Sequence, residues 1–352
     1  MVELLSWAAV TRIDRGDTTV RRYDIQYPYL DGAAHRVLER AALDALGAVA
    51  SARLREPGIR TWLEVGSDGS WAIEADGDGL DLRDAWRLAA RERPHDVELA
   101  WRHPGAMADT TYRVTTYDAA RGPTTRTQLG PWDPTDPIRY PDPQRHRTVH
   151  VRRAPIAPRL AARVVVEAGR LAQRLHAAGI VHGMLTSEAI AVARDGTVEL
   201  HRIATYLCRR RGAQYVGSGT PGRFFADLAP ELVGGGAVTP ASDVFQLAST
   251  LYELLAFSPA WMRATAHDSI EALRLETLPA ISTIDPDAAA LDAVLAHALA
   301  RDPAARPSLR ELVDTIEAAY AASASDRQDR AQIVADAMRA DPARSSAHDV
   351  PM

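Results

Sequence analysis

The sequence predicts an α+β protein in which a small, β-rich first part precedes a larger, mainly helical second part. Residues 2–30 and 59–75 alternate apolar and polar side chains, a pattern typical of half-buried β-strands. From Pro158 onward, apolar side chains recur every three or four residues, as they do in amphipathic helices. With 352 residues and 46% hydrophobic side chains, the chain can bury one large core or two modest ones.

The first part covers residues 1–93 and follows a β-β-α-β-β-α order. Two strands are predicted on either side of the turn Asp-Arg-Gly-Asp, and apolar residues at helical spacing predict a helix over 33–54. Two further strands, 59–65 and 70–75, flank the turn Gly-Ser-Asp-Gly, and a second helix is predicted over 82–93.

Residues 94–157 break this pattern, and we interpret them as an insertion or proline-rich linker. Short strands are predicted at 96–101 and 111–117, but 130–143 contains too many prolines for a helix or a central strand. Two interpretations stay open for the aromatic side chains of this segment. They either cover the first part or form a partner-binding surface, and they are Trp101, Trp132 and Tyr140.

The second part covers residues 158–320, and a polar tail follows over 321–352. Apolar periodicity predicts helices over 159–179, 241–257, 289–301 and 308–322. The tail has few apolar residues, so we expect it to be partly disordered with one short amphipathic segment.

Composition excludes several classes of function. A net charge of −5 gives no general attraction to nucleic acid, and no apolar run approaches the about 18–20 residues of a membrane span. The single cysteine, Cys208, excludes an internal disulfide and fits a reducing compartment, so we expect a cytoplasmic protein. The histidines show no metal-ligand spacing, which predicts no metal site. The chain has no lysine and no asparagine, so any mechanism that needs either side chain is excluded.

Four consecutive motifs give the second part a family resemblance. They are LHAAGIVHGMLTSEAIAVARDGTVEL, GTPGRFFADLAPEL, TPASDVFQLASTLYELL and ARDPAARPSLREL, at 175–200, 219–232, 239–255 and 300–312. In order and spacing they resemble the C-terminal lobe of bacterial Ser/Thr protein kinases of the eukaryotic type. The resemblance covers about 158–320 and extends more weakly to 1–93 as the N-terminal lobe. It implies a two-lobed protein-kinase-like fold with a nucleotide cleft between the lobes.

At the positions where this family carries its catalytic groups, the chain carries other residues. Met184 replaces the catalytic base, Ala189 replaces the metal-binding asparagine, and Arg202 replaces the magnesium-binding aspartate. Phosphoryl transfer needs a base and metal ligands, so the resemblance implies that this chemistry is lost. We expect these three positions to line a cleft. The nearest acids in the sequence, Asp195 and Glu199, are explained by a turn and a strand.

The first part departs from the family in the same way. The segment LLSWAAV has no glycine between its two presumed strands, although close approach of a backbone to phosphates requires glycine. The anchoring lysine of the third strand aligns with Tyr23. Glu39 matches the helix glutamate that would pair with that lysine, or is an exposed helix charge. The resemblance also places Ile73 at the entrance to an adenine pocket.

The positions that hold the fold together match the family. The resemblance implies that Glu231 and Arg306 form a buried ion pair between the activation segment and the helical lobe, and that Asp243 holds the catalytic-loop backbone. His182 is expected to pack within that loop. The architecture is therefore expected to persist although the chemistry is absent.

The sequence thus predicts a pseudokinase that acts as a regulatory or scaffold binding module, with binding of ATP and magnesium absent or weak. Two alternatives stay open. One is a divergent kinase or other nucleotide transferase with relocated catalytic acids, and the other is a nucleotide-binding switch without catalysis. We expect a protein partner, such as an active kinase, a phosphatase or a phosphopeptide-binding module, and no nucleic acid. The candidate contact for an acidic or phosphorylated patch is the run Arg209, Arg210 and Arg211.

Overall fold

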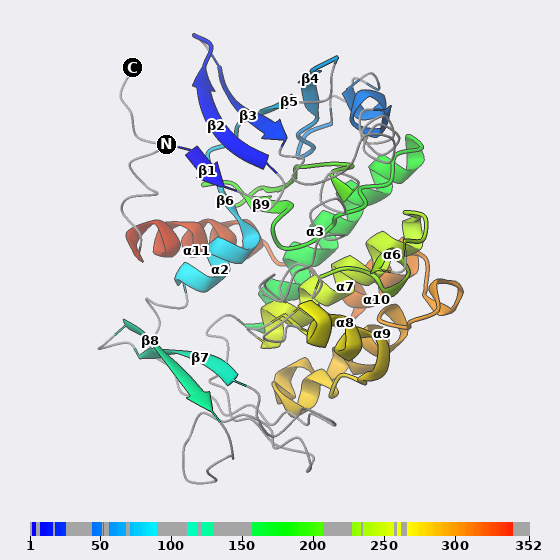
Figure 1. Cartoon of the computed structure of the whole chain (residues 1–352). Helices are drawn as coiled ribbons and strands as arrows, with labels where there is room; N and C mark the ends of the chain where they lie inside the picture. Colours follow the sequence, from blue (N-terminus) through cyan, green and yellow to red (C-terminus); the bar gives the residue numbers. More distant parts are fainter. Residues whose placement is uncertain are drawn as a thin grey trace.

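The computed structural model has a small β-sheet lobe above a larger helical lobe (Figure 1). This confirms the predicted α+β, two-lobed fold. The structure describes residues 2–4, 8–16, 18–25, 44–50, 52, 56–67, 71–89, 111–118, 122–129, 157–206, 227–233, 235–256, 259–261 and 266–340.

The small lobe is built on a five-stranded antiparallel sheet. Its strands are β1 (Val2–Leu4), β2 (Ala8–Asp14), β3 (Thr19–Ile25), β4 (Trp62–Val65) and β5 (Trp71–Ala75), in the order β1-β2-β3-β5-β4. Alternation places Val10 and Tyr23 opposite one another on the buried face, because successive side chains of a strand point to opposite sides. The rings of Tyr23 and Trp62 meet edge to face at 5.2 Å. Of the helix predicted over 33–54, the described part, residues 44–50, is helical.

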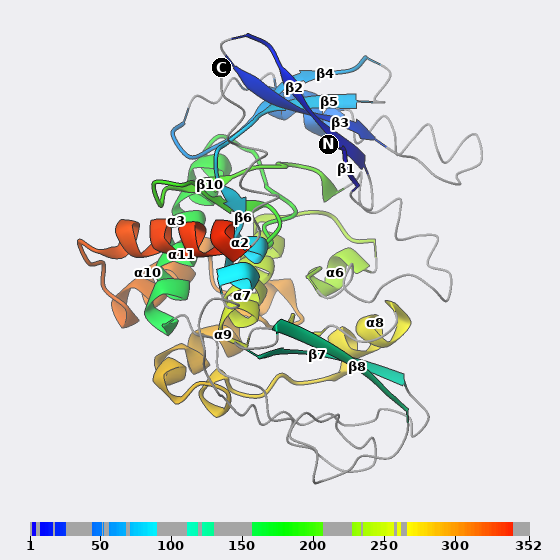
Figure 2. The ribbon, with the colours of Figure 1, turned by 90° about the vertical axis from the view of Figure 1, so that its left-hand side faces the viewer.

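The chain enters the large lobe through a short hinge, residues 76–79. It then forms β6 (Leu80–Asp81) and α2 (Leu82–Ala89). Strand β6 pairs with β9 (Ile190–Val192), which pairs with β10 (Val198–Leu200), so the second sheet has the order β10-β9-β6. This sheet lies directly below the five-stranded one (Figure 2) and brings the hinge next to the segment that follows β10.

The large lobe packs around α7 (Pro240–Ala256), whose residues from Ser242 onward are all buried. A helix buried all round is expected at the centre of a helical domain. Around it lie α3 (Pro158–Ala177), α6 (Pro230–Val233), α8 (Ala266–Leu275), α9 (Asp292–Ala298) and α10 (Leu309–Ala319), with 3-10 turns at Ile281–Thr283, Pro286–Leu291 and Pro303–Ala305. Helix α10 begins at a capping box in which Ser308 and Glu311 bond each other's backbone N–H groups.

The C-terminal segment differs from the prediction of a polar tail. Residues Asp326–Ala340 form a helix, α11, that packs across α2 and also touches α3 and β9 (Figure 2). Its buried apolar residues, Ile333, Val334, Ala337 and Met338, join the main core. The short amphipathic segment expected in the tail is this helix. It is more deeply buried than expected, because Asp326, Arg330 and Asp336 are buried and paired within the protein although their charge suggests exposure.

The segment between α2 and α3 contains a hairpin, β7 (Thr111–Asp118) and β8 (Gly122–Leu129). In both views it lies at the end of the molecule opposite the five-stranded sheet (Figures 1 and 2). Strand β8 was not predicted, because its sequence GPTTRTQL has almost no apolar alternation. The strand expected at 96–101 and the aromatic residues Trp101, Trp132 and Tyr140 lie outside the described residues. Among the described residues, no helix has the length and apolar composition needed to span a bilayer.

Candidate functional site

The loop that carries the predicted catalytic positions is fixed to α7 by buried hydrogen bonds. The Asp243 carboxylate accepts from the backbone N–H of His182 at 2.9 Å and of Gly183 at 2.7 Å. Gln246 accepts from the N–H of Leu185 at 3.0 Å. The His182 ring is fully buried and its Nδ1 accepts from the Met184 N–H, and burial lowers its pKa. The loop backbone is therefore held as rigidly as a catalytic loop would require.

The side chains of that loop do not open onto solvent. Met184 and Ala189 are each 1% exposed and belong to the core, so the expectation that they line a cleft is wrong. Packing explains the difference, because the Met184 sulfur lies against the Gln246 side chain and the loop closes over both. A carboxylate introduced at position 184 would therefore be buried with no cation placed to pair with it among its described contacts, which carries a desolvation cost of several kcal/mol.

Arg202 lies at the centre of a buried charged cluster between the lobes. Its backbone N–H donates to Glu74 Oε1 at 2.6 Å, its Nη1 donates to the Glu188 carbonyl at 3.0 Å, and its Nη2 lies 3.1 Å from Asp81 Oδ2. The side chain is only 4% exposed. Arg202 and Ala204 both have a positive φ, 57° and 61°, which is strained for residues with a Cβ. The surrounding contacts therefore hold the backbone in this shape.

Glu74 and His201 complete the cluster. Tyr23 donates its hydroxyl hydrogen bond to Glu74 Oε2 at 3.0 Å. The His201 ring is fully buried, with Nε2 3.2 Å from Asp81 Oδ1 and Nδ1 3.8 Å from Glu74 Oε2. Thus β3, β5, β6 and the segment after β10 each contribute one or two polar side chains to one enclosed site.

Burial and charge set the protonation of this cluster. Burial raises the pKa of Glu74, although Arg202 opposes the shift. Burial alone would also raise the pKa of Asp81, but the Arg202 guanidinium and His201 hold it well below its usual range. Burial lowers the pKa of His201 to about 3, so its ring is neutral at physiological pH. Burial and the adjacent Glu74 raise the pKa of Tyr23, so its hydroxyl stays protonated as a hydrogen-bond donor.

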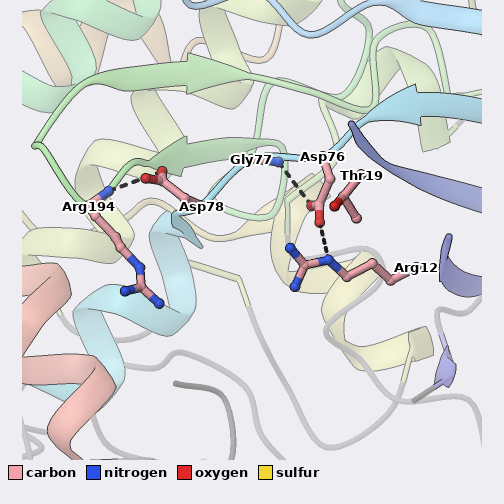
Figure 3. A pocket seen from close by; sticks show the side chains of 6 residues that line it. All are labelled: Arg12, Thr19, Asp76, Gly77, Asp78 and Arg194. Carbon is pink, nitrogen blue, oxygen red and sulfur yellow. Dashed lines mark hydrogen bonds and ion pairs between the residues drawn. The ribbon is translucent and has the colours of Figure 1, made fainter. Parts of the chain in front are cut away.

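The hinge is surrounded by charged residues as well. Asp76 accepts from Arg21 Nε at 2.6 Å and pairs with Arg12 Nε at 2.7 Å. Beside these pairs lies a hollow of about 360 Å³ whose wall comes from β2, β3, the hinge and the β9–β10 turn (Figure 3). It is lined by Arg12, Thr19, Asp76, Gly77, Asp78 and Arg194. This lining lacks the apolar surface on which a flat base would pack.

The expected ion pair of the large lobe is bidentate. Arg306 Nη1 and Nη2 donate to Glu231 Oε1 and Oε2 at 2.9 and 2.8 Å. The Arg306 guanidinium also bonds the carbonyls of Ala241 and Arg301, and it lies 4.8 Å from the Phe245 ring centre. Burial would raise the pKa of Glu231, but Arg306 holds it below its usual value.

Several predicted positions lie elsewhere or outside the described residues. Ile73 is buried within β5 and so does not form an open pocket entrance. Asp195 sits in the turn after β9 and pairs with Arg327, and Glu199 pairs with Arg60. Glu39 and the run Arg209, Arg210 and Arg211 lie outside the described residues.

Sequence reasoning missed Glu74, Asp81 and His201. One signal was present for Glu74, because it shares a strand face with the buried Ala72 and β5 lies between two other strands. A charged residue on that face needs a buried partner. Asp81 and His201 gave no such signal, because their pairing depends on how β6 approaches β10.

The residues present do not fit a magnesium-bound nucleotide. Of the two positions expected to bind the metal, one carries the Ala189 methyl and the other carries a guanidinium that is paired with Asp81. Within the described ranges, no three His, Cys, Asp or Glu side chains are grouped so that they could hold a metal ion. Of the acids of the charged cluster, Asp81 is paired with Arg202, and Glu74 accepts hydrogen bonds from Tyr23 and from the Arg202 backbone.

Comparison with known proteins agrees with the two-lobed fold. Residues 146–316 match the family model of protein tyrosine and serine/threonine kinases. The chain has a protein-kinase fold. Over 186 residues it is 31% identical to serine/threonine-protein kinase PknE of Mycobacterium tuberculosis, which covers 51% of this chain and 31% of PknE. The same values hold for PknE of Mycobacterium bovis.

A more distant relative is serine/threonine-protein kinase PAK 4 of Mus musculus. It is 26% identical over 145 residues, which cover 40% of this chain and 23% of PAK 4. The chain therefore matches about a third or less of the length of these relatives. The similarity concerns the kinase-like domain of this chain and its Ser/Thr kinase homologues.

Proposed function

We propose that this protein is a pseudokinase that works in signalling by binding other proteins and transfers no phosphate. The observation that carries the proposal is the ion pair between Arg202 and Asp81. A cation fills the position where the family resemblance expects the carboxylate that binds magnesium. Catalysis of phosphoryl transfer relies on metal ions that bridge and neutralise the phosphates. A fixed guanidinium at that position repels a metal ion and removes a ligand for it.

Two further positions support the proposal. Met184 offers a thioether where a carboxylate would accept the proton of the attacking hydroxyl, and losing a positioned base alone lowers a rate by about 10²–10⁴. Tyr23 presents a neutral hydroxyl, already bonded to Glu74, where a lysine would hold phosphate. All of these losses act on one transition state, so they are not multiplied.

The alternative is a nucleotide transferase with relocated acids. It is favoured by one observation, the presence of the carboxylates of Glu74 and Asp81 in the cleft. Both are already engaged, however, Glu74 by Tyr23 and the Arg202 backbone and Asp81 by Arg202 and His201. Using them to bind a metal would require breaking these contacts, so we favour the binding role.

The partner that we propose is a protein with an acidic or phosphorylated surface, such as an active kinase, a phosphatase or a phosphopeptide-binding module in the cytoplasm. Arginine binds planar anions through two parallel hydrogen bonds, and the run Arg209, Arg210 and Arg211 offers three such side chains in the presumed activation segment. The compartment is proposed from the single cysteine of the chain.

The test is a thermal-shift titration of the full chain with ATP, magnesium and both together, alongside a phosphate-transfer assay with labelled ATP. A ligand at about 100 times its Kd stabilises the folded state by about 2.7 kcal/mol, which raises the melting temperature visibly. We expect less than about 1 °C of shift with about 1 mM Mg-ATP and incorporation of label no higher than in a reaction without protein.

Two outcomes would contradict the proposal. A Mg-ATP shift above about 2 °C would show that the cleft binds nucleotide. Magnesium-dependent labelling of the protein itself or of a general protein substrate would establish catalysis. A shift with ATP alone, without labelling, would instead favour a nucleotide-binding switch.

A further inference from the structure

The contacts that join the two lobes converge on a short segment, residues 199–203. The Trp62 indole of β4 donates to the Ile203 carbonyl at 2.7 Å, and Glu74 of β5 accepts from the Arg202 N–H. Just before them, Arg60 forms an ion pair with Glu199. Its backbone N–H donates to the Leu200 carbonyl at 2.8 Å, and Ile59 forms an isolated parallel bridge with Leu200. The small lobe is thus held to the large lobe from its inner side.

The charges at this junction require a cation. Glu74 comes from the small lobe and is fully buried, and Asp81 comes from the strand after the hinge and is 14% exposed. Removing one partner of a buried ion pair leaves an uncompensated charge, which is strongly unfavourable. The Arg202 guanidinium pairs with Asp81, whereas Glu74 is bonded by the Arg202 backbone N–H and has Arg60, Arg202 and Arg21 as nearby cations. The guanidinium also bonds the Glu188 carbonyl of the catalytic loop.

The backbone around Arg202 is strained in a way that fits this role. A positive φ at Arg202 places its N–H toward Glu74 while its side chain reaches Asp81 on another element. Such conformations persist only where the surrounding contacts over-determine them. One residue thus bonds the small lobe through its backbone and the large lobe through its side chain.

We infer that the Arg202 guanidinium, by pairing with Asp81 and bonding the Glu188 carbonyl, holds the segment 199–203 in the shape that bonds the small lobe, and so keeps the two lobes together without metal or nucleotide. The site that another kinase-fold protein would fill with a bound cation is occupied here by a covalently attached one. The relative position of the lobes is therefore fixed at all times. The inference rests on the proposed binding role, and under that role the surface offered to a partner does not depend on ATP concentration.

The experiment is hydrogen–deuterium exchange of the full chain and of three variants, without substrate or partner. Arg202→Met removes the charge at similar length, Arg202→Lys keeps it, and Arg202→Ala leaves room for added guanidinium as a probe. The matched control is Arg327→Ala, whose exposed pair with Asp195 lies away from the cluster. Exchange in segments 71–81 and 198–206 reports on the contacts between the lobes, and exchange in α7 reports on global stability.

We expect exchange of both reporting segments in the unmodified protein to be unchanged by Mg²⁺ or Mg-ATP. Arg202→Met and Arg202→Ala should raise exchange there at least about tenfold with α7 unaffected, because local opening frees these segments before the core. Guanidinium at about 10 mM should slow exchange in Arg202→Ala alone, since only that variant has the empty site. Arg202→Lys and Arg327→Ala should stay within about twofold of the unmodified protein.

The inference is overturned if Arg202→Met leaves exchange unchanged, if α7 opens equally, or if guanidinium has no effect on Arg202→Ala. Should Arg202→Met and Arg202→Ala fail to fold while Arg202→Lys folds, the requirement for charge is upheld, whereas failure of all three would reduce Arg202 to a packing residue. Phosphate transfer is measured separately. Phosphate transfer by the protein would refute the proposed function without affecting the exchange result. Conversely, an exchange result against the role of Arg202 would not affect the conclusion that the protein transfers no phosphate.

Discussion

The Arg306–Glu231 ion pair of the large lobe and the charged cluster around Arg202 both compensate the charge of an enclosed carboxylate, and they do so with different residues. Arg306 and Glu231 are partners that the family resemblance implies, and their bidentate geometry is regular. Arg202 and Asp81 are equally enclosed, yet the resemblance implies an acid where Arg202 stands. In one region the residues match those that the resemblance implies, whereas in the other the sign of the charge is reversed. Under the proposed function, the fold keeps its frame while the position of the reactive centre serves as a structural contact.

The largest expected effect on the free energy of unfolding comes from breaking the Arg306–Glu231 ion pair. Arg306→Ala should lower the free energy of unfolding by about 3–5 kcal/mol, because Glu231 would stay buried without a counter-charge. The control is Arg310→Ala on the same stretch of chain. Its pair with Asp314 is 84% and 64% exposed, so the loss should stay below about 0.5 kcal/mol. Urea unfolding measures both, and similar values for the two variants would refute the structural role of the pair.

A decrease in pH is expected to have an intermediate effect on the free energy of unfolding, through His201 of the charged cluster. His201 has a pKa of about 3 in the folded protein, because it is buried, and an ordinary pKa near 6.5 when unfolded. Between these values the unfolded chain binds the extra proton, so stability falls as the pH drops below about 6.5. We expect a loss of about 2 kcal/mol between pH 6.5 and 5.

Other groups modify this pH dependence, and a variant isolates His201. The pKa of His182 is also lowered by burial, so His182 likewise decreases the stability of the fold as the pH falls. The pKa of Glu74 is raised by burial, so Glu74 increases the stability of the fold as the pH falls. Asp81 contributes stability that is lost only below about pH 4, outside this window. His201→Gln should flatten the curve measured by urea unfolding at pH 7, 6 and 5. An unchanged slope in that variant would show that His201 is not the cause.

The smallest effect should be a gain. Ala204→Gly removes the Cβ from a residue with a positive φ, which relieves about 1–2 kcal/mol of strain against a glycine entropy cost of about 0.5–1. We expect a net stabilisation of about 0.5–1 kcal/mol by thermal unfolding. The matched change Ala296→Gly, at an exposed position in α9, should instead destabilise by about 1 kcal/mol. Destabilisation by both would mean that the backbone at 204 is not strained.

Much of the fold could be predicted from local patterns. The strands at 59–65 and 70–75 and the helices at 82–93, 241–257 and 308–322 correspond to β4, β5, α2, α7 and α10, because each buries one face or a whole surface at a regular period. Motif spacing indicated Met184, Ala189 and Arg202 as the degenerate catalytic positions, and that assignment stays a prediction. The contacts of Arg202 could not be predicted, since Glu74 and Asp81 lie more than a hundred residues away in the sequence. Helix α11 was expected only as a short amphipathic segment of a polar tail, because its charged residues find partners only in the folded protein.

Helix α11 connects the C-terminal part of the chain to the elements that follow the hinge. It rests on α2, the helix that directly follows the hinge, and it is fastened by arginine contacts to Glu167 and Asp195. Gly196 lets the helix come this close, because a Cβ there would lie 1.9 Å from the Arg327 carbonyl oxygen. A load on the chain at Ala340 would therefore be shared by α2, by α3 through Glu167 and by the β9–β10 turn through Asp195. Tension applied to α11 would thus reach the elements that directly follow the hinge.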